Sequence, residues 1–290
     1  MSLIKMLDGF TSKNLMKKRS SRREMFATVG SLGKKAAAAA VPFGLATNKV
    51  NAAAFFQETT GPVEALQFAL LLERLEDQFY MMALESGVLT GRGARVENVF
   101  MDISAHESAH VEFLENNLTD AGADVSNMPT FDFTAGGLFD PFNDNGDADT
   151  AYAQVLALAQ AFEDTGVRAY KGQAPNLMNT PYLEPALRIH SVEARHAAAI
   201  RRIRGLEGWI TLDNPGAGIP TQAEGVYAGE ANVTQGGVDL TTLDYGDSPL
   251  VGDVAEAVSQ AFDEPLSMDD VSAIAGLFIA ADNGESDEED

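Results

Sequence analysis

Apolar residues recur at the spacing of an amphipathic α-helix in four long segments of the chain. The first segment begins near Pro62, with proline in the first turn, and ends near Gly87, where glycine is a natural stop. We expect the other three helices at about residues 94–118, from a Thr150 cap to residue 172, and from 180 to 206. The pattern therefore predicts an all-α fold built as a four-helix bundle.

The first and third of these segments resemble each other. Residues 66–80 read LQFALLLERLEDQFY, and residues 156–170 read LALAQAFEDTGVRAY. Each has an acid inside an apolar run, and aligning Glu73 with Glu163 aligns the two segments at an offset of 90 residues. This repeat indicates an internal duplication.

The second and fourth segments share a Glu-x-x-His motif. Glu107 precedes His110 by three residues, and Glu193 precedes His196 by the same spacing, 86 residues further on. On an α-helix this spacing places both side chains on one face, one turn apart, where a carboxylate and an imidazole can bind one metal ion. The duplicated unit is thus a helix pair that reads Glu, then Glu-x-x-His.

Carboxylates and imidazoles inside apolar stripes are costly to bury unless a cation compensates for their charge. A bundle with one Glu from each of two helices and Glu-x-x-His from the other two is the arrangement of di-metal carboxylate sites. The alternatives are solvated helix faces or buried ion pairs with arginine. We predict two metal ions held by six residues: Glu73, Glu107, His110, Glu163, Glu193 and His196.

Several neighbouring residues leave alternatives open. Glu76 lies near Glu73 on the helix and could replace it as a ligand, although the match to Glu163 favours Glu73 and a solvent-facing Glu76. His106 is either a partner or spare ligand at the site or a polar rim residue. We favour the rim, because the duplicated helix has Val192 at the matching position.

Two tyrosines, Tyr80 and Tyr170, stand seven residues after Glu73 and Glu163. They are candidates for a catalytic role beside the ligands. The open alternatives are core packing, hydrogen bonds to the ligand carboxylates, and redox activity near the metals.

The rest of the chain carries weaker patterns. Residues 119–149 have turn chemistry and no helical period, which suits a long crossover to a parallel third helix. We expect residues 209–250 to form an extended wrap or a few short strands, and residues 251–282 to hold two short helices. The second of these begins with a Ser267 cap and Asp270 three residues on, and residues 283–290 form an acidic tail.

Composition narrows the chemistry. The 290 residues include no cysteine, so disulfides and thiolate metal sites are excluded and iron, manganese or zinc bound by oxygen and nitrogen remain. No run of 18 apolar residues predicts a transmembrane span. The formal net charge is −23, and beyond residue 52 the chain has ten basic against 41 acidic residues, which disfavours nucleic acid and anionic membranes as partners.

The basic residues gather at the N-terminus. Residues 1–54 have the character of an export leader, because Ser21–Phe26 resembles a twin-arginine motif, small residues follow, and Ala52–Ala54 offers a cleavage zone. We expect export through the twin-arginine translocase to the periplasm or the cell exterior. The alternative is a disordered basic arm.

The duplicated Glu, Glu-x-x-His pattern resembles the ferritin-like di-iron carboxylate superfamily. The segments SRREMF, LLLERLEDQFY, HESAHVEFL, VEARHAAAIR and AFDEPLSMDDV are most similar to exported ferritin-like domain proteins of the desiccation-related branch, over residues 55–280. This resemblance implies terminal carboxylates at Glu73 and Glu163, bridging carboxylates at Glu107 and Glu193, and one histidine on each metal.

The same resemblance implies two iron ions, ferrous iron with oxygen or peroxide as reactants, and a homo-oligomer as a possible state. Ferroxidase-like or peroxide-consuming activity in iron or oxidative-stress handling is the first expectation. A dimanganese catalase-like enzyme and a non-enzymatic, metal-stapled protein of desiccation or stress protection are the alternatives.

Overall fold

A computed structural model of the chain describes residues 61–126, 128–142, 146–219, 221–246 and 253–280. The described residues divide into two compact units. The larger unit holds the described residues within 61–210, 214–228 and 263–280, and the smaller one holds the described residues within 211–213, 229–246 and 253–262. The predicted export leader and acidic tail lie outside the described residues, so they stay predictions.

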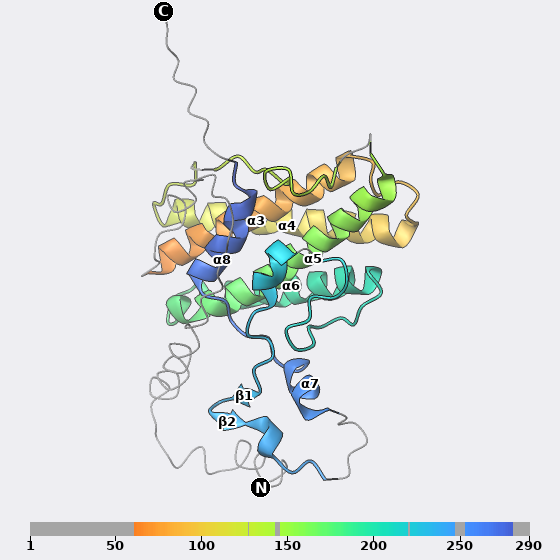
Figure 1. Cartoon of the computed structure of the whole chain (residues 1–290). Coiled ribbons are helices and arrows are strands. Elements are labelled where there is room, and N and C mark those ends of the chain that lie inside the picture. The colour runs from red at the N-terminus through yellow and green to blue at the C-terminus, as the bar shows by residue number, and fades with distance from the viewer. Residues whose placement is uncertain (1–60, 127, 143–145, 220, 247–252, 281–290) are drawn as a thin grey trace, which may run out of the picture. The chain divides into compact units, whose positions relative to one another are not determined.

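Four long helices form the larger unit (Figure 1): α3 (Pro62–Glu85), α4 (Ala94–Asp120), α5 (Ala148–Gln173) and α6 (Leu183–Ile203). Helix α3 packs along α4, and α5 packs along α6, so each duplicated hairpin is a packed pair. The predicted all-α bundle is confirmed. None of the described helices is both long and apolar enough to cross a membrane.

The helix starts differ from prediction in two places. Helix α5 begins before Thr150, because the carboxylate of Asp147 caps it and accepts hydrogen bonds from the Asp149 amide at 3.3 Å and the Thr150 hydroxyl at 2.5 Å. Helix α6 begins only at Leu183, after the 3₁₀ helix η2 (Ala174–Leu177) and a turn.

The long connection from α4 to α5 is the predicted crossover, and its aromatic residues enter the core. Phe133 packs edge-on against Phe79 with ring centroids 5.3 Å apart. Phe131 forms an antiparallel bridge with Ile279, which ties the crossover to the end of the larger unit. The crossover is thus part of the folded unit and covers one side of the bundle core.

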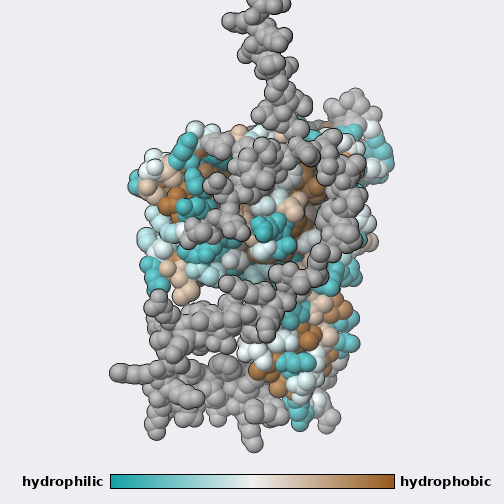
Figure 2. All heavy atoms as spheres, turned by 60° about the vertical axis from the view of Figure 1, so that its left-hand side comes forward, coloured by the Kyte–Doolittle hydropathy of each residue, from teal (hydrophilic) through white to brown (hydrophobic). Residues whose placement is uncertain are grey.

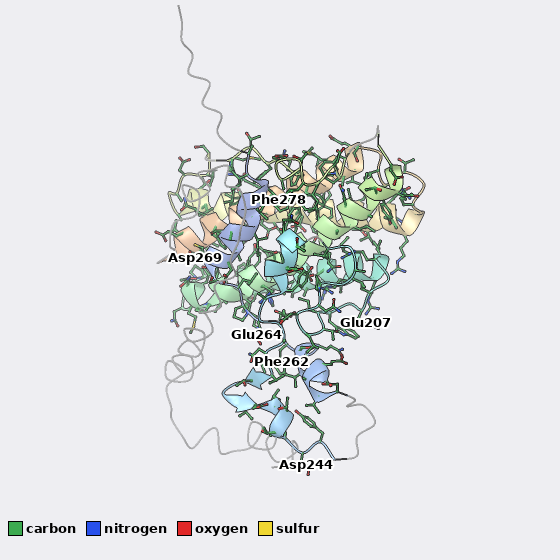
Figure 3. The ribbon with its side chains drawn as sticks, viewed as in Figure 1. Glu207, Asp244, Phe262, Glu264, Asp269 and Phe278 are labelled. Carbon is green, nitrogen blue, oxygen red and sulfur yellow. The ribbon has the colours of Figure 1, made fainter. Side chains whose placement is uncertain are left out.

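The C-terminal part of the larger unit packs on α5. It comprises η3 (Thr221–Tyr227), α8 (Met268–Ala275) and η5 (Gly276–Phe278). Helix α8 starts with the predicted capping box of Ser267 and Asp270. Phe278, labelled in Figure 3, packs edge-on against Phe162 of α5, with centroids 4.8 Å apart and planes at 84°.

The fully buried Arg168 of α5 anchors this C-terminal part. Its guanidinium donates hydrogen bonds to the carbonyls of Ala228 and Glu264, each at 2.7 Å, and to that of Val226. A charged side chain at such depth is stable only when its donors are satisfied, so these carbonyls fix the returning chain on α5.

The smaller unit is short on regular structure. Strands β1 (Thr234–Gln235) and β2 (Val238–Asp239) pair as an antiparallel hairpin across Gly236 and Gly237, both at positive φ. The other elements are η4 (Leu240–Thr242) and α7 (Val254–Ser259), which the Asp253 side chain caps.

The bundle core consists of two apolar clusters. On α3, for example, Leu66 and Leu70 belong to one cluster, and Leu75 and Phe79 belong to the other. The buried Glu73 lies between these two pairs of residues along α3. On the face shown in Figure 2, hydrophilic and hydrophobic residues are interspersed on the described surface.

A glycine on α5 permits close contact with the returning chain. A Cβ at Gly172 would overlap the backbone oxygen of Leu266, which cannot swing away as a side chain can. We expect Gly172→Ala to lower the free energy of unfolding by about 1–3 kcal/mol or more, measured by denaturant titration. The control is Gly225→Ala, whose Cβ would meet Ile274 at 3.9 Å, and an equal loss in both variants would contradict the packing argument.

Candidate metal centre

The four bundle helices bring the six predicted residues together in one buried layer. The four glutamates are completely buried, and His110 and His196 are 9 % and 4 % exposed. Their ligand atoms form two overlapping groups that could each hold a metal ion. One group is Glu73, Glu107, His110 and Glu193, and the other is Glu107, Glu163, Glu193 and His196.

Three carboxylates surround the Nδ1 atom of His110. It lies 3.0 Å from Glu73 Oε2, 3.1 Å from Glu107 Oε2 and 3.3 Å from Glu193 Oε1. These oxygens come from α3, α4 and α6, so the His110 ring lies where three helices meet.

The Nδ1 atom of His196 has an equivalent environment. It lies 2.8 Å from Glu107 Oε1 and 3.3 Å from Glu163 Oε2. Neither this nitrogen nor either of these two oxygens has a partner in hydrogen-bond geometry, despite the short distances. The three atoms therefore lie close together and make no hydrogen bonds to one another.

The electrostatics of this layer favour a cation. Burial and the nearby charges of Glu107 and Glu73 raise the pKa of Glu193 well above its usual value. Burial, followed by the charge of Glu73, raises the pKa of Glu107 to about 8. Burial alone would lower the pKa of His110, but the carboxylates of Glu107, Glu193 and Glu73 beside its Nδ1 atom raise it to about 12. Protons are thus retained in this layer when no metal neutralises it.

The unpartnered atoms test whether a metal pair fits. Buried polar atoms normally have hydrogen-bond partners, yet six atoms of this layer have none. They are Glu76 Oε2, Glu107 Oε1, Glu163 Oε2, both carboxylate oxygens of Glu193, and His196 Nδ1. All are donors of the oxygen and nitrogen type that iron and manganese accept, so the residues fit a pair of such ions.

The family model of the ferritin-like domain matches residues 61–206, which span all four bundle helices and the crossover. The chain belongs to the ferritin-like domain family. No curated protein matches the chain.

Within this ferritin-like domain, the two hairpins are related by reciprocal contacts. Tyr80 of α3 donates a hydrogen bond to Glu163 of α5 at 2.5 Å, and Tyr170 of α5 donates one to Glu73 of α3. In each pair, the earlier residue of one helix meets the later residue of the other, so α3 and α5 run antiparallel. Because α3 and α4 form a hairpin, α4 and α5 are parallel, as the long crossover predicts.

The tyrosines therefore have the first two of the three roles left open by the sequence: they pack in the core and donate hydrogen bonds to the candidate ligand carboxylates. Burial, followed by the charge of Glu163, raises the pKa of Tyr80 well above its usual value, and burial with the charge of Glu73 does the same for Tyr170. Both hydroxyls consequently keep their protons and act as donors.

Removing these hydroxyls yields a prediction about stability. Tyr80→Phe leaves Glu163 without its donor in a buried site, so we expect the free energy of unfolding to fall by about 1–3 kcal/mol. Tyr170→Phe should behave alike at Glu73. Tyr152→Phe is the control, since the Tyr152 ring is only partly buried beneath Arg92. Denaturant titration of the three variants measures the free energies of unfolding. Equal stability of Tyr80→Phe and the unmodified protein would contradict the hydrogen bond from Tyr80 to Glu163.

Glu76 was predicted to face solvent, and this prediction is wrong. It is 3 % exposed, and its Oε2 atom has no partner. The reason lies on α5, where the duplicated position is Gly166: a Cβ there would lie 3.4 Å from Glu76 Oε1 and 3.0 Å from Glu193 Oε2. The missing side chain leaves room for a fifth buried carboxylate. Glu76 is not in either group of converging ligand atoms, whereas Glu73 is.

His106 lies at the exposed rim, as favoured, and it also has the partner role that the sequence left open. Its ring is exposed, but its Nδ1 atom lies 2.9 Å from the outer nitrogen, Nε2, of His196. His106 therefore contacts a candidate ligand from the solvent side.

One buried arginine also bears on the alternative of ion pairs. Arg201 of α6 is buried and pairs with Asp164 through two hydrogen bonds of 2.6 and 3.0 Å. The four glutamates of the layer instead have imidazoles as their ion-pair partners. Arg201 thus neutralises Asp164, which precedes Thr165 and follows Glu163, and the charges of the four glutamates remain available to a metal ion.

Proposed function

We propose that this ferritin-like domain binds two ferrous ions and oxidises them with oxygen or peroxide. The observation that carries the proposal is the convergence of unpartnered, fully buried carboxylate and imidazole atoms in two overlapping groups. A hydrophobic bundle gains nothing from such a layer by itself, because uncompensated buried charges oppose folding.

The geometry supports distinct roles for the four carboxylates. Glu107 places Oε1 2.8 Å from His196 and Oε2 3.1 Å from His110, so it presents one oxygen to each side and suits a bridging position. Glu193 also belongs to both groups. Glu73 and Glu163 each belong to one group and suit terminal positions.

Charge balance is consistent with a pair of divalent ions. Four ionised carboxylates would carry four negative charges, which two ferrous ions neutralise. Glu76 adds a fifth carboxyl group beside them, and burial followed by the charge of Glu193 raises its pKa well above the usual value. A neutral Glu76 therefore leaves the balance intact.

The residues of this chain would bind the metal ions, orient the ligand carboxylates and exclude water. When bound, two iron ions held a few ångströms apart supply two electrons together to oxygen or peroxide. Tyr80 and Tyr170 fix the outer oxygens of Glu163 and Glu73, which leaves the other oxygen of each carboxylate facing the centre. The two apolar clusters flank the layer and keep bulk water away from it.

Export belongs to the same proposal. The twin-arginine-like segment Ser21–Phe26 supports a protein that acts in the periplasm or outside the cell, in iron or oxidative-stress handling. Such a route carries folded proteins, so the centre can be loaded before export. The desiccation-related branch is proposed from the sequence motifs alone.

Elemental analysis of the protein from its native compartment tests the proposal, followed by an aerobic ferrous-oxidation assay. We expect two irons per chain and oxidation faster than in buffer alone. Two manganese ions with oxygen evolution from peroxide would replace iron chemistry by a catalase reaction, for which the carboxylate-rich donor set is also suitable. Bound metal without turnover would leave a structural, stress-protective role, and a metal-free protein would overturn the proposal.

A further inference from the structure

One contact that the proposed function leaves without a role joins His106 to His196. His106 lies on α4 one residue before Glu107, and its Nδ1 atom is 2.9 Å from Nε2 of His196 on α6. The two rings are nearly parallel, with an angle of 8° between their planes and centroids 5.2 Å apart. This geometry aims a ring nitrogen of His106 at the back of a candidate ligand.

The tautomers follow from the direction in which His196 faces the centre. Its Nδ1 atom points at Glu107 and Glu163, so this is the nitrogen that would bind a metal. A neutral imidazole that offers Nδ1 to a metal carries its hydrogen on Nε2. That N–H then donates to His106 Nδ1, and the hydrogen of His106 resides on its own Nε2.

The same contact is missing from the other half of the duplicated centre. The position that matches His106 on α6 is Val192, 86 residues later. Among the residues that the structure describes, no hydrogen bond reaches the Nε2 atom of His110. The two halves of the centre therefore have matching ligands, but in the described part of the chain the hydrogen bond to the outer ring nitrogen is found at His196 and not at His110.

We propose that His106 is a positioning residue that holds His196 in the metal-binding tautomer and makes the two metal positions unequal. The position beside His196 and Glu163 binds its ion more tightly than the one beside His110 and Glu73. This inference rests on the proposed di-metal site. A group that hydrogen-bonds to a metal-binding histidine fixes its ring orientation and raises its basicity, and its loss typically costs about 10–100-fold in metal affinity.

Two substitutions separate the hydrogen bond from packing. His106→Phe keeps an aromatic ring next to His196 but removes the acceptor. His106→Gln keeps an acceptor, since its amide oxygen can receive the hydrogen of His196 Nε2. Val192→Ala is the matched control, because it alters the duplicated position, where no such bond exists.

The experiment is an anaerobic titration of the full chain with cobalt(II), followed by absorption spectroscopy and calorimetry. The unmodified protein should bind two ions in two steps. In His106→Phe the tighter step should weaken by about 10–100-fold with a change in the spectrum of one cobalt ion, while the weaker step stays unchanged. His106→Gln should restore the tighter step, and Val192→Ala should bind as the unmodified protein does.

Different results contradict different claims. Two ions bound by the unmodified protein, with His106→Phe unchanged or with both steps equally weakened, would overturn the positioning role and leave the di-metal site standing. Failure of His106→Gln to recover the tighter step would also overturn it. An unmodified protein that binds no cobalt would overturn the proposed centre together with this inference.

Discussion

Replacing Glu107 with alanine is expected to remove both metal ions from the protein. Glu107 is the residue whose two carboxylate oxygens face the two histidines, at 2.8 Å from His196 Nδ1 and 3.1 Å from His110 Nδ1. Its loss removes one oxygen donor from each of the two groups of ligand atoms and one of the four negative charges of the centre. We expect affinity to fall by more than about 100-fold, beyond the cost of losing an outer hydrogen-bond partner.

Metal content per chain after dialysis measures this effect. The matched control is Glu112→Ala, on the same helix but with an exposed side chain. Far-ultraviolet circular dichroism checks that both variants keep their helices. Glu107→Gln keeps the shape and removes the charge, so it should also lose the metal pair. Two ions retained in both Glu107 variants would contradict the assignment of Glu107 to a bridging position.

Much of the fold could be predicted because its determinants are local and repeated. The helical period of residues 66–80 recurs in residues 156–170, so two weak signals supported each other. The Glu-x-x-His spacing places two side chains on one helix face whatever the rest of the chain does. For these reasons the four helices, their order and the six converging residues follow from sequence patterns alone.

Glu76 was beyond such reasoning, because its burial depends on a neighbour in space. A charged residue next to Glu73 on an amphipathic helix ordinarily faces water. Here the space comes from Gly166, three residues after Glu163 on another helix. Comparing the duplicated segments at this position, glutamate against glycine, was the one signal available.

Long-range polar contacts were missed for the same reason. His106 bonds to His196, which lies 90 residues away. Arg201 pairs with Asp164, and Arg168 holds carbonyls of the returning chain. Helical periodicity says which face of a helix is apolar, but it does not say which buried polar groups meet.

Without metal, the stability of the ferritin-like domain is expected to fall as the pH rises from 6 to 8. The pKa of Glu107 is raised to about 8 in the folded protein, from an ordinary value of 4.5. Over this range the folded protein keeps a proton that the unfolded chain has already lost, so each rise in pH favours unfolding. His110 and His196, with pKa values raised to about 12 and about 11, act in the same direction above their ordinary value of 6.5.

One group of the centre, Glu73, titrates outside this pH window. Burial raises the pKa of Glu73, but the hydrogen bond and charge of His110 lower it overall, so Glu73 adds stability that is lost only when the pH falls below its ordinary 4.5. It does not titrate between pH 6 and 8, and neither do exposed carboxylates. The slope in this window therefore reports on the buried centre and not on the acidic surface.

The size of the effect makes it measurable. The raised pKa of Glu107 alone corresponds to a few kcal/mol between pH 6 and 8, on the order of 1.4 kcal/mol for each unit of pH. We expect the melting temperature of the chelator-treated protein to fall by several degrees over this range. Saturating manganese(II) displaces the retained protons, so the stabilisation that it provides should grow with pH.

Calorimetry at pH 6, 7 and 8, with chelator and with manganese(II), tests this coupling between protons and metal. Glu107→Gln should reduce the slope of the metal-free protein, because the amide has no proton to lose, and the remaining slope comes from His110 and His196. Glu112→Ala should keep the slope, since its side chain is exposed and lies outside the buried centre. A metal-free protein that becomes more stable from pH 6 to 8, or a metal effect independent of pH, would mean that the glutamates of the layer are already ionised before the metal binds.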